Sequence, residues 1–253
     1  MDLQFLDFAI DADIGVVTLQ RPETLNALDI PLARELQAVC AEVCSRPRVR
    51  ALIITGAGRG FCAGGDLSAF RQPREEMKAH SLTITGHLHD AIVNLTRMDV
   101  PCVAAVNGVA AGAGFALVCA CDLAVAGSSA TFMAAYTLAG LSPDLGLTYF
   151  LPRLVGVGAA RSLILTNRRI AAAEALGLGL VSRVVPDGEA VLAAKAACRE
   201  ILKGSSAAIA ATKRLLADAD LRGLEQQLEA ERQSLAALSA SDEAYERCRR
   251  FVK

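Results

Sequence analysis

The first hundred residues alternate between the two hydrophobic spacings that distinguish strands from helices. Residues 14–19 (I-G-V-V-T-L) are mostly β-branched and lead into turn residues, which predicts a strand. Asp29 then precedes apolar positions at helical spacing, so we expect a helix that Asp29 caps, with Pro31 in its first turn. Residues 49–55 (V-R-A-L-I-I-T) predict a second, buried strand that ends in a glycine-rich loop.

The same succession of elements returns further along the chain. Residues 68–98 are more polar and predict helix, apart from a loop around Pro73. Residues 100–106 (V-P-C-V-A-A-V) predict a strand, and a glycine-bearing turn at 107–114 (N-G-V-A-A-G-A-G), an apolar helix and a strand at 122–126 (D-L-A-V-A) follow. A repeated strand, turn and helix predicts an α/β fold built from stacked ββα units.

Only helical patterns follow Ala190. One side of this helical pattern carries an apolar stripe of leucines, and the other side carries Glu and Arg. The stripe consists of Leu221, Leu224, Leu228, Leu235 and Leu238. A stripe of this kind packs either on a neighbouring subunit or on the chain's own core, and the pattern favours neither. We expect a core of residues 1–190 and a helical oligomerisation region of residues 191–253.

The composition excludes several classes of partner. The chain has 253 residues, 53% of them hydrophobic, and 26 basic and 27 acidic residues give a net charge of −1. This balance gives no reason to expect nucleic acid or a membrane as a partner. The acidic start M-D-L-Q-F-L-D-F lacks the layout of a signal peptide, and the eight cysteines form no C-x-x-C pair. We therefore expect a cytoplasmic protein with free thiols.

Two glycine-rich turns follow predicted strands, and neither fits a nucleotide-phosphate loop. The first, G-A-G-R-G-F-C-A-G, lacks the lysine and hydroxyl of a Walker loop, and Phe61 stands where a dinucleotide fingerprint needs its third glycine. Each turn starts a helix, where unpaired backbone N–H groups can meet a ligand. Two such turns facing each other would form an oxyanion hole. The alternative is that small residues only allow close packing of helices.

Several motifs in order carry a more specific signal. They are R-P-E-T-L-N-A-L-D, L-I-I-T-G-A-G-R-G-F-C-A-G-G-D-L, P-C-V-A-A-V-N-G-V-A-A-G-A-G, C-D-L-A-V-A, G-L-S-P-D-L-G-L-T-Y-F-L-P-R-L-V-G and R-I-A-A-A-E-A-L-G-L-G-L-V-S-R-V-V. Together they resemble the enoyl-CoA hydratase/isomerase (crotonase) superfamily over roughly residues 5–190. The resemblance implies a crotonase-type spiral of ββα units, an acyl-CoA thioester substrate and a role in fatty acid metabolism. It also implies a homotrimer or dimer of trimers that the C-terminal helices help to hold together.

The resemblance also implies a set of site residues. Carried over by motif, the two amides that stabilise a thioester enolate are those of Ala63 in F-C-A-G-G-D and Ala113 in A-G-A-G-F. Contacts with CoA would come from the loop before the first helix and from the backbone after Ala63. These binding residues are Leu25, Asn26, Ala27, Leu28, Gly64, Gly65, Asp66 and Leu67. Asp66 is also expected to cap the helix start that follows it. No cofactor or metal is required.

The active-site pattern departs from that of the hydratases in this superfamily. Hydratases carry two glutamates that activate water, and the corresponding positions here are Ala116 and Tyr136, which we place at the substrate. Alanine transfers no proton, and a tyrosine of ordinary pKa is a poor base at neutral pH. The remaining carboxylate is Asp144 in L-S-P-D-L-G, which resembles the single catalytic acid of Δ3,Δ2-enoyl-CoA isomerases and of ring-epoxide phenylacetyl-CoA isomerases.

The sequence therefore favours an isomerase that converts 3-enoyl-CoA to 2-enoyl-CoA through a dienolate, with Asp144 as acid and base. Four alternatives stay open. S-P-D-x-G is also ordinary β-turn chemistry. Asp144 and Tyr136 could instead serve a hydratase or lyase. Asp144 could attack an aromatic acyl-CoA as a nucleophile, as in the related dehalogenases. Finally, the chain could bind acyl-CoA without turnover.

Three further features bear on the site. The histidines His80, His87 and His89 lack an acidic ligand pattern, so a solvent-facing helix over the acyl pocket is their ordinary explanation. Candidates for lining that pocket are Phe70, Met77 and Leu82. Lys253, in a basic stretch, is a candidate contact for CoA phosphates.

Overall fold

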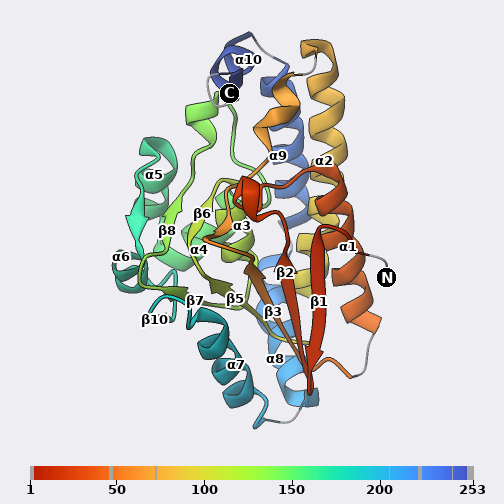
Figure 1. Cartoon of the computed structure of the whole chain (residues 1–253), viewed down its shortest axis with the longest axis vertical. Helices are drawn as coiled ribbons and strands as arrows, with labels where there is room; N and C mark the ends of the chain where they lie inside the picture. The colour runs from red at the N-terminus through yellow and green to blue at the C-terminus, as the bar shows by residue number, and fades with distance from the viewer. Residues whose placement is uncertain are drawn as a thin grey trace.

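Two sheets organise the computed structural model, which describes residues 3–45, 48–71, 73–204, 206–221, 224–240 and 242–249 (Figure 1). The larger sheet has the order β1-β2-β3-β5-β7-β10 and the smaller one β4-β6-β8-β9. The strands are β1 (Leu6–Asp11), β2 (Ile14–Leu19), β3 (Ala51–Gly56), β4 (Gly60–Cys62), β5 (Cys102–Val106), β6 (Val109–Ala111), β7 (Leu123–Gly127), β8 (Thr131–Met133), β9 (Ile170–Ala171) and β10 (Arg183–Val185).

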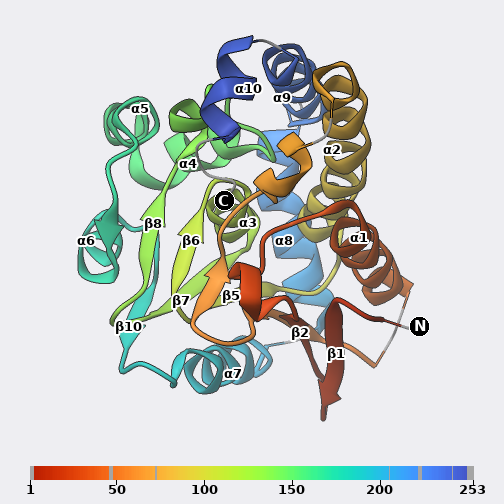
Figure 2. The same ribbon diagram turned by 45° about the horizontal axis from the view of Figure 1, so that its top comes forward.

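The helices surround both sheets (Figure 2). They are α1 (Ile30–Ser45), α2 (Arg74–Arg97), α3 (Ala113–Ala120), α4 (Leu147–Val155), α5 (Val157–Thr166), α6 (Ala172–Gly177), α7 (Ala190–Ile201), α8 (Ser206–Leu221), α9 (Leu224–Ser239) and α10 (Asp242–Arg249). Short 3₁₀ helices occupy η1 (Pro22–Thr24), η2 (Leu67–Arg71) and η3 (Tyr136–Ala139). As predicted, Asp29 caps α1: the Leu32 N–H donates to Asp29 Oδ1 at 2.9 Å.

The predicted ββα repeat is confirmed, and it links the two sheets. In each unit the first strand (β3, β5 or β7) joins the larger sheet, and the second (β4, β6 or β8) joins the smaller one. A helix follows each pair: α2, α3 and α4. Residues 109–111, predicted as part of a turn, form β6, because they pair in parallel with β4 and β8.

Both faces of the larger sheet are covered, which explains why its central strands are apolar throughout. Alternate residues of β3 point to different cores. Ile53 belongs to the cluster that α7 completes through Ala194 and Cys198, whereas Ile54 belongs to the main core with α1, α2 and α3. Strands β2, β3, β5, β7 and β10 run parallel, and β1 pairs antiparallel with β2 from Leu6↔Leu19 to Asp11↔Ile14.

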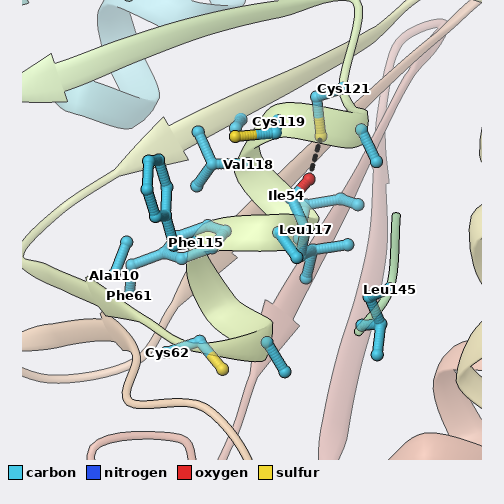
Figure 3. Close-up of a cluster of buried hydrophobic side chains, with 14 of the residues drawn as sticks. Ile54, Phe61, Cys62, Ala110, Phe115, Leu117, Val118, Cys119, Cys121 and Leu145 are labelled. Atoms are coloured by element: carbon cyan, nitrogen blue, oxygen red, sulfur yellow. Dashed lines mark hydrogen bonds between the residues drawn. The ribbon is translucent and has the colours of Figure 1, made fainter. Parts of the chain in front are cut away.

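Helix α3 lies at the centre of the main core (Figure 3). All eight of its residues are buried, which suits a helix that is apolar on every side. Phe115 packs against Phe132 with ring centroids 5.8 Å apart. Near the end of the helix the Cys121 thiol donates to the carbonyl of Leu117, the dashed contact in Figure 3. The start of α3 is therefore held rigidly by its surroundings.

The C-terminal helices pack on the chain's own core. Helix α9 lies beside α2 in both views, and Leu224 and Leu228 are buried against Tyr149 and Val93 (Figures 1 and 2). For Leu224 and Leu228, the predicted stripe therefore packs on the chain's own core. The side chains of Leu221 and Leu238 lie outside the described residues, as does Lys253. The boundary between residues 190 and 191 stays a prediction. Among the described residues, no helix is long and apolar enough to cross a membrane.

Candidate active site

A cavity of about 140 Å³ opens where the two predicted glycine turns meet α2, α9 and the loop before α4. The glycine turns contribute backbone, and the helices contribute apolar side chains. Its lining consists of Ala63, Gly64, Gly65, Asp66, Leu67, Phe70, His80, Ser81, Ile84, Thr85, Leu88, Gly112, Ala113, Ala135, Tyr136, Ala139, Leu141, Asp144, Leu145 and Leu235. Most of the predicted site residues are therefore brought together around one space.

The two glycine turns lie directly against each other. Gly64 has φ +101°, and a Cβ on it would come within 2.9 Å of the Ala111 carbonyl oxygen and 3.5 Å of the Ala113 nitrogen. Only glycine adopts this conformation without strain and leaves room for the second turn. The two turns therefore do face one another, and close packing, the alternative explanation of their small residues, holds here as well.

The amide predicted for the first turn is already in use. The Ala63 N–H donates to the Leu25 carbonyl at 2.9 Å, which joins the turn to the loop before α1. A backbone N–H has one proton to donate, so this amide is not available to a substrate. In this structure the predicted oxyanion donor of Ala63 is engaged by Leu25, although Ala63 does line the cavity.

The Gly65 amide has the freedom that the Ala63 amide lacks. On either side of it, the Leu28 N–H donates to Gly64 O at 2.7 Å and the Asp66 N–H donates to Leu28 O at 2.8 Å. The Gly65 N–H itself has no acceptor among the described residues, and a Cβ on Gly65 would meet no atom within 4 Å. Gly65 thus borders open space with an unused donor.

Ala113 has the second amide without an acceptor among the described residues, and its role as an oxyanion donor stays a prediction. It is the first residue of α3, whose opening N–H groups have no partner within the helix. No described residue accepts from its N–H, while the Gly112 N–H just before it donates to Met133 O at 3.0 Å. Gly65 and Ala113 therefore present two backbone donors to one cavity, which is the arrangement of an oxyanion hole.

Asn26 holds the first turn in this position. It is fully buried with φ +59°, and its side-chain Nδ2 donates to the carbonyls of Ala57, Gly60 and Phe61 at 2.8 to 3.2 Å. The predicted CoA-binding residues 25–28 stand behind the turn, outside the cavity lining, and the side chains of Asn26 and Leu28 are buried. Their contact with CoA stays a prediction, and for Asn26 and Leu28 it would have to come from the backbone.

Asp66 caps the start of η2, as expected. The Ser68 N–H donates to Asp66 Oδ1 at 2.9 Å, and Arg21 forms an ion pair with Asp66 Oδ2 at 3.0 Å. Burial opposes ionisation of Asp66, but the hydrogen bonds from Ser68 and Arg21 outweigh it and lower the pKa of the carboxyl below its ordinary value. Asp66 is thus a paired, ionised carboxylate with a structural role.

Asp144 is a turn residue and also a buried wall of the cavity. The Leu147 N–H donates to its carbonyl at 3.1 Å, just before α4 begins. Only 1% of the residue is exposed, and its side chain lines the cavity. Oδ2 is buried without a partner among the described residues. An ionised carboxylate oxygen in this state is costly unless it serves a ligand or a reaction.

His89 is the site residue that the sequence pattern does not reveal. Its Nε2 lies 2.7 Å from Asp144 Oδ1, and the residue is buried rather than facing solvent. His87 on the same helix contacts Gln37 on α1 instead, so the two histidines do point to different faces. The signal that could have identified His89 is its spacing of four residues from Thr85 and eight from Ser81, both in the cavity lining.

The remaining candidates divide between cavity and core. Tyr136 lines the cavity, and its hydroxyl reaches the Asp144 carbonyl at 3.5 Å, the long limit of a hydrogen bond. Ala116 is fully buried outside the lining, so its predicted substrate contact is not supported. Of the three predicted acyl-pocket residues, Phe70 lines the cavity. Met77 is buried against Phe70 outside the lining, and Leu82 lies elsewhere on α2.

Neither a metal cluster nor a reactive thiol accompanies the cavity. Within the described part of the chain, no group of three His, Cys, Asp or Glu residues is placed to hold a metal ion. Burial raises the pKa of the Cys62 thiol, beside Ala63, to about 12, so this group is not a nucleophile at neutral pH. Among the groups at the cavity that no described residue already engages are Asp144 Oδ2 and the backbone amides of Gly65 and Ala113.

Comparison with known proteins agrees with this geometry. The enoyl-CoA hydratase/isomerase family matches residues 9–253. A "probable enoyl-CoA hydratase" of Rhodobacter capsulatus is 37% identical over 85% of this chain and 81% of its own, and a 1,2-epoxyphenylacetyl-CoA isomerase of Escherichia coli is 32% identical over 94% and 92%. The crystal structure of an enoyl-CoA hydratase/isomerase from Mycobacterium paratuberculosis superimposes with a TM-score of 0.91 at 28% identity, covering 99% of this chain and all of that one. The fold is thus the crotonase type, and the chain belongs to the enoyl-CoA hydratase/isomerase family.

Proposed function

We propose that the protein is an enoyl-CoA isomerase that converts a 3-enoyl-CoA to the 2-enoyl-CoA, with Asp144 as base and then acid. The observation that carries the proposal is the state of Asp144. Its carboxylate is buried in the cavity lining, and Oδ2 has no partner among the described residues. The cavity contains one other carboxylate, that of Asp66, which Arg21 and Ser68 already engage.

The reaction needs only these groups. Asp144 Oδ2 removes a proton from C2, and the electron pair of that C–H bond moves to the thioester oxygen to give a dienolate. The electron pair then returns from the oxygen, C4 takes the proton back from Asp144, and the double bond is left at C2=C3. The dienolate formed in between carries its charge on the oxygen, which the Gly65 and Ala113 amides would stabilise, each by about 3 kcal/mol. One base on one face of the substrate serves both transfers.

The cavity also limits the acyl group. Its volume of about 140 Å³ is close to that of the engineered apolar cavity of about 150 Å³ that binds benzene. An acyl portion of about six carbon atoms, aliphatic or aromatic, fits this volume, and a long fatty chain does not. Phe70, Ile84, Leu88 and Leu141 make its walls apolar. We therefore propose short-chain or aromatic acyl-CoA thioesters as substrates.

Hydration is disfavoured by what the cavity lacks. Activation of water by the family's usual pair of glutamates is impossible, because Ala116 and Tyr136 stand at those positions. Several relatives carry hydratase names, but those names describe relatives, not this chain's residues. A trimer or dimer of trimers, a cytoplasmic location and independence of a cofactor remain part of the proposal.

The first experiment follows the ultraviolet absorbance of the conjugated thioester with 3-hexenoyl-CoA and, separately, with 2-hexenoyl-CoA. We expect absorbance to rise with the 3-enoyl substrate and Asp144→Asn to lower kcat at least about 10³-fold. Asp90→Asn is the matched control, because this exposed carboxylate on α2 contacts Gln37 away from the cavity. Loss of absorbance from 2-hexenoyl-CoA would instead show hydration, and no change in either case with retained binding would show an acyl-CoA-binding protein.

The contact between His89 and Asp144 favours one second candidate, substitution of a halide on an aromatic acyl-CoA. Asp144 Oδ2 would attack the ring carbon, the halide would leave with its electron pair, and water would hydrolyse the aryl ester after losing a proton to His89. A single turnover in ¹⁸O-labelled water separates this route from isomerisation. The product's new oxygen would be unlabelled because it comes from Asp144, and halide would be released.

A further inference from the structure

We propose that His89 is a positioning residue that donates a hydrogen bond to Asp144 Oδ1 and leaves Oδ2 as the one oxygen that works on the substrate. The inference rests on the proposed function of Asp144 as a base. The two side chains are 10% and 1% exposed, and His89 Nε2 lies 2.7 Å from Asp144 Oδ1.

The hydrogen-bonding inventory of Asp144 makes His89 its essential partner. An ionised carboxylate only accepts, so Nε2 must carry the proton in this contact. No other described group donates to either carboxylate oxygen of Asp144: Oδ2 has no partner, and Tyr136 and Leu147 reach only its backbone carbonyl. His89 is therefore the group that fixes the orientation of this buried carboxylate.

The direction of the contact matters for a proton shuttle. With Oδ1 fixed by the imidazole, rotation of the carboxylate about its terminal bond would break the hydrogen bond. Oδ2 is therefore the carboxylate oxygen left without a partner among the described residues in a side chain that lines the cavity, and in the proposed reaction it removes the C2 proton and returns it at C4. Burying a charged pair seldom adds stability over an apolar pair of equal size, so a purely structural role is a weak explanation of this contact.

Helix α2 fixes His89 at the required place. Ser81, Thr85 and His89 follow one another at four-residue intervals and so lie on one face. The Ser81 and Thr85 side chains are themselves held, by Ser239 Oγ at 3.0 Å and by the Ser81 carbonyl at 2.7 Å. The same helix face thus lines the cavity and carries the residue that orients the base.

The test compares His89→Phe, which keeps a ring but loses the donor, with His89→Gln, whose amide nitrogen can reach the position of Nε2. His87→Phe is the matched control on the same helix, because His87 contacts Gln37 and is absent from the cavity lining. Each variant is assayed for isomerisation of 3-hexenoyl-CoA and for exchange of the C2 hydrogens of butyryl-CoA in D₂O. The second assay needs only proton removal, so it reports on the base even if no double bond shifts.

We expect His89→Phe to lower kcat and the exchange rate about 100-fold, with KM within about threefold of wild type. His89→Gln should recover most of the loss and stay within about tenfold of wild type, still below it. In an Asp144→Asn background, His89→Phe should cause no further loss, because both changes remove the same function. The His87→Phe control should match wild type.

Three results would overturn the inference: an unchanged kcat in His89→Phe, a change in KM alone, or a Gln variant no better than Phe. If His89→Phe does not fold, the Gln variant decides, since an unchanged exchange rate in it contradicts a directional hydrogen bond. Wild-type exchange without double-bond shift would refute the isomerase but leave the role of His89 measurable. Absence of exchange in the wild type would refute both.

Discussion

At the scale of single residues, the site depends on how each backbone amide is used. Ala63 and Gly65 are two residues apart in the same turn, yet the Ala63 N–H is consumed by Leu25 and the Gly65 N–H is not. The difference follows from the pairing of the turn with Leu28. This pairing uses Gly64 O and the Asp66 N–H, and it orients the Gly65 amide away from Leu28. Nothing in the letters F-C-A-G-G-D distinguishes these two amides.

Gly64→Ala tests how closely the two turns must approach. A Cβ at φ +101° would meet the Ala111 carbonyl at 2.9 Å, so the turns must separate. We expect kcat for the 3-enoyl thioester to fall about 10²-fold or more, because the paired amides no longer converge. Gly188→Ala is the matched control: φ is +85° there, with no atom within 4 Å, so strain arises away from the site. Equal losses of kcat in both variants would contradict the prediction.

His80 gives a prediction for the pH dependence of stability. Burial lowers the pKa of His80 below its ordinary value, against the opposing charges of Asp66 and Asp29. The unfolded chain therefore binds more protons than the folded one as pH falls below about 6.5, and the free energy of unfolding decreases in that direction. Urea denaturation between pH 7 and 5 should show a smaller decrease for His80→Gln than for wild type. Parallel curves for the two proteins would refute this assignment.

At the scale of elements, α2 and α9 both contribute to the walls of the cavity that we propose for the acyl group. Helix α2 contributes one long face to it, whereas α9 contributes Leu235. The two helices are joined by the hydrogen bond between Ser81 Oγ and Ser239 Oγ at 3.0 Å. A segment from the last fifth of the chain is thus part of a cavity whose chemistry comes from residues 63 to 144.

Leu235→Ala should therefore change substrate preference. Removing the side chain enlarges the cavity at the α9 wall, so kcat/KM should rise for a 3-octenoyl thioester relative to a 3-hexenoyl one, by about tenfold. Leu228→Ala is the control on the same helix, because Leu228 packs against Tyr149 outside the cavity. Both variants should lose about 2–4 kcal/mol of stability, and only the first should alter the ratio. An unchanged ratio in Leu235→Ala would show that α9 does not limit the chain.

At the scale of the whole molecule, repetition of one unit builds both the core and the site. Each ββα unit places its first strand in one sheet and its second in the other, so the starts of successive helices come to lie side by side. The start of α3 and the loop before α4 reach the cavity in this way. The C-terminal helices then pack against the units, and a buried lysine is one of the described contacts between α8 and the core.

Lys213 is the buried lysine on α8. Its Nζ donates to the carbonyls of Leu95 and Val100 at 2.9 Å each and to Asp122 Oδ2 at 2.6 Å. Lys213→Met removes the donor to all three acceptors and leaves Asp122 Oδ2 with only the Cys102 N–H, and we expect a loss of about 3 kcal/mol in urea denaturation at neutral pH. Lys203→Met, which removes an exposed pair with Glu200, should cost less than about 0.5 kcal/mol. Similar values for both variants would mean that Lys213 contributes no more than a surface charge.

Much of the fold could be predicted from local pattern. The strand at residues 14–19 has the predicted bounds, the Asp29 cap forms, and the ββα repeat is present. The sequence pattern did not predict the short strand β6. Its three residues between glycines show no alternation of apolar and polar positions, and they form a strand only through pairing with β4 and β8. Two of three predicted acyl-pocket side chains were misplaced, since helical periodicity tells which face is apolar but not which neighbour that face meets.

The sequence by itself determined the α/β class and the family, and it singled out Asp144 as the candidate for the reactive carboxylate. Apolar periods, caps and motif order are local properties that are written directly in the chain. Only the tertiary structure decided that Gly65 rather than Ala63 keeps a free amide, and that His89 meets Asp144 across 55 positions of sequence. Such contacts depend on the docking of α2 and the two turns, and a hydrogen bond is made or lost within about 0.5 Å of that placement.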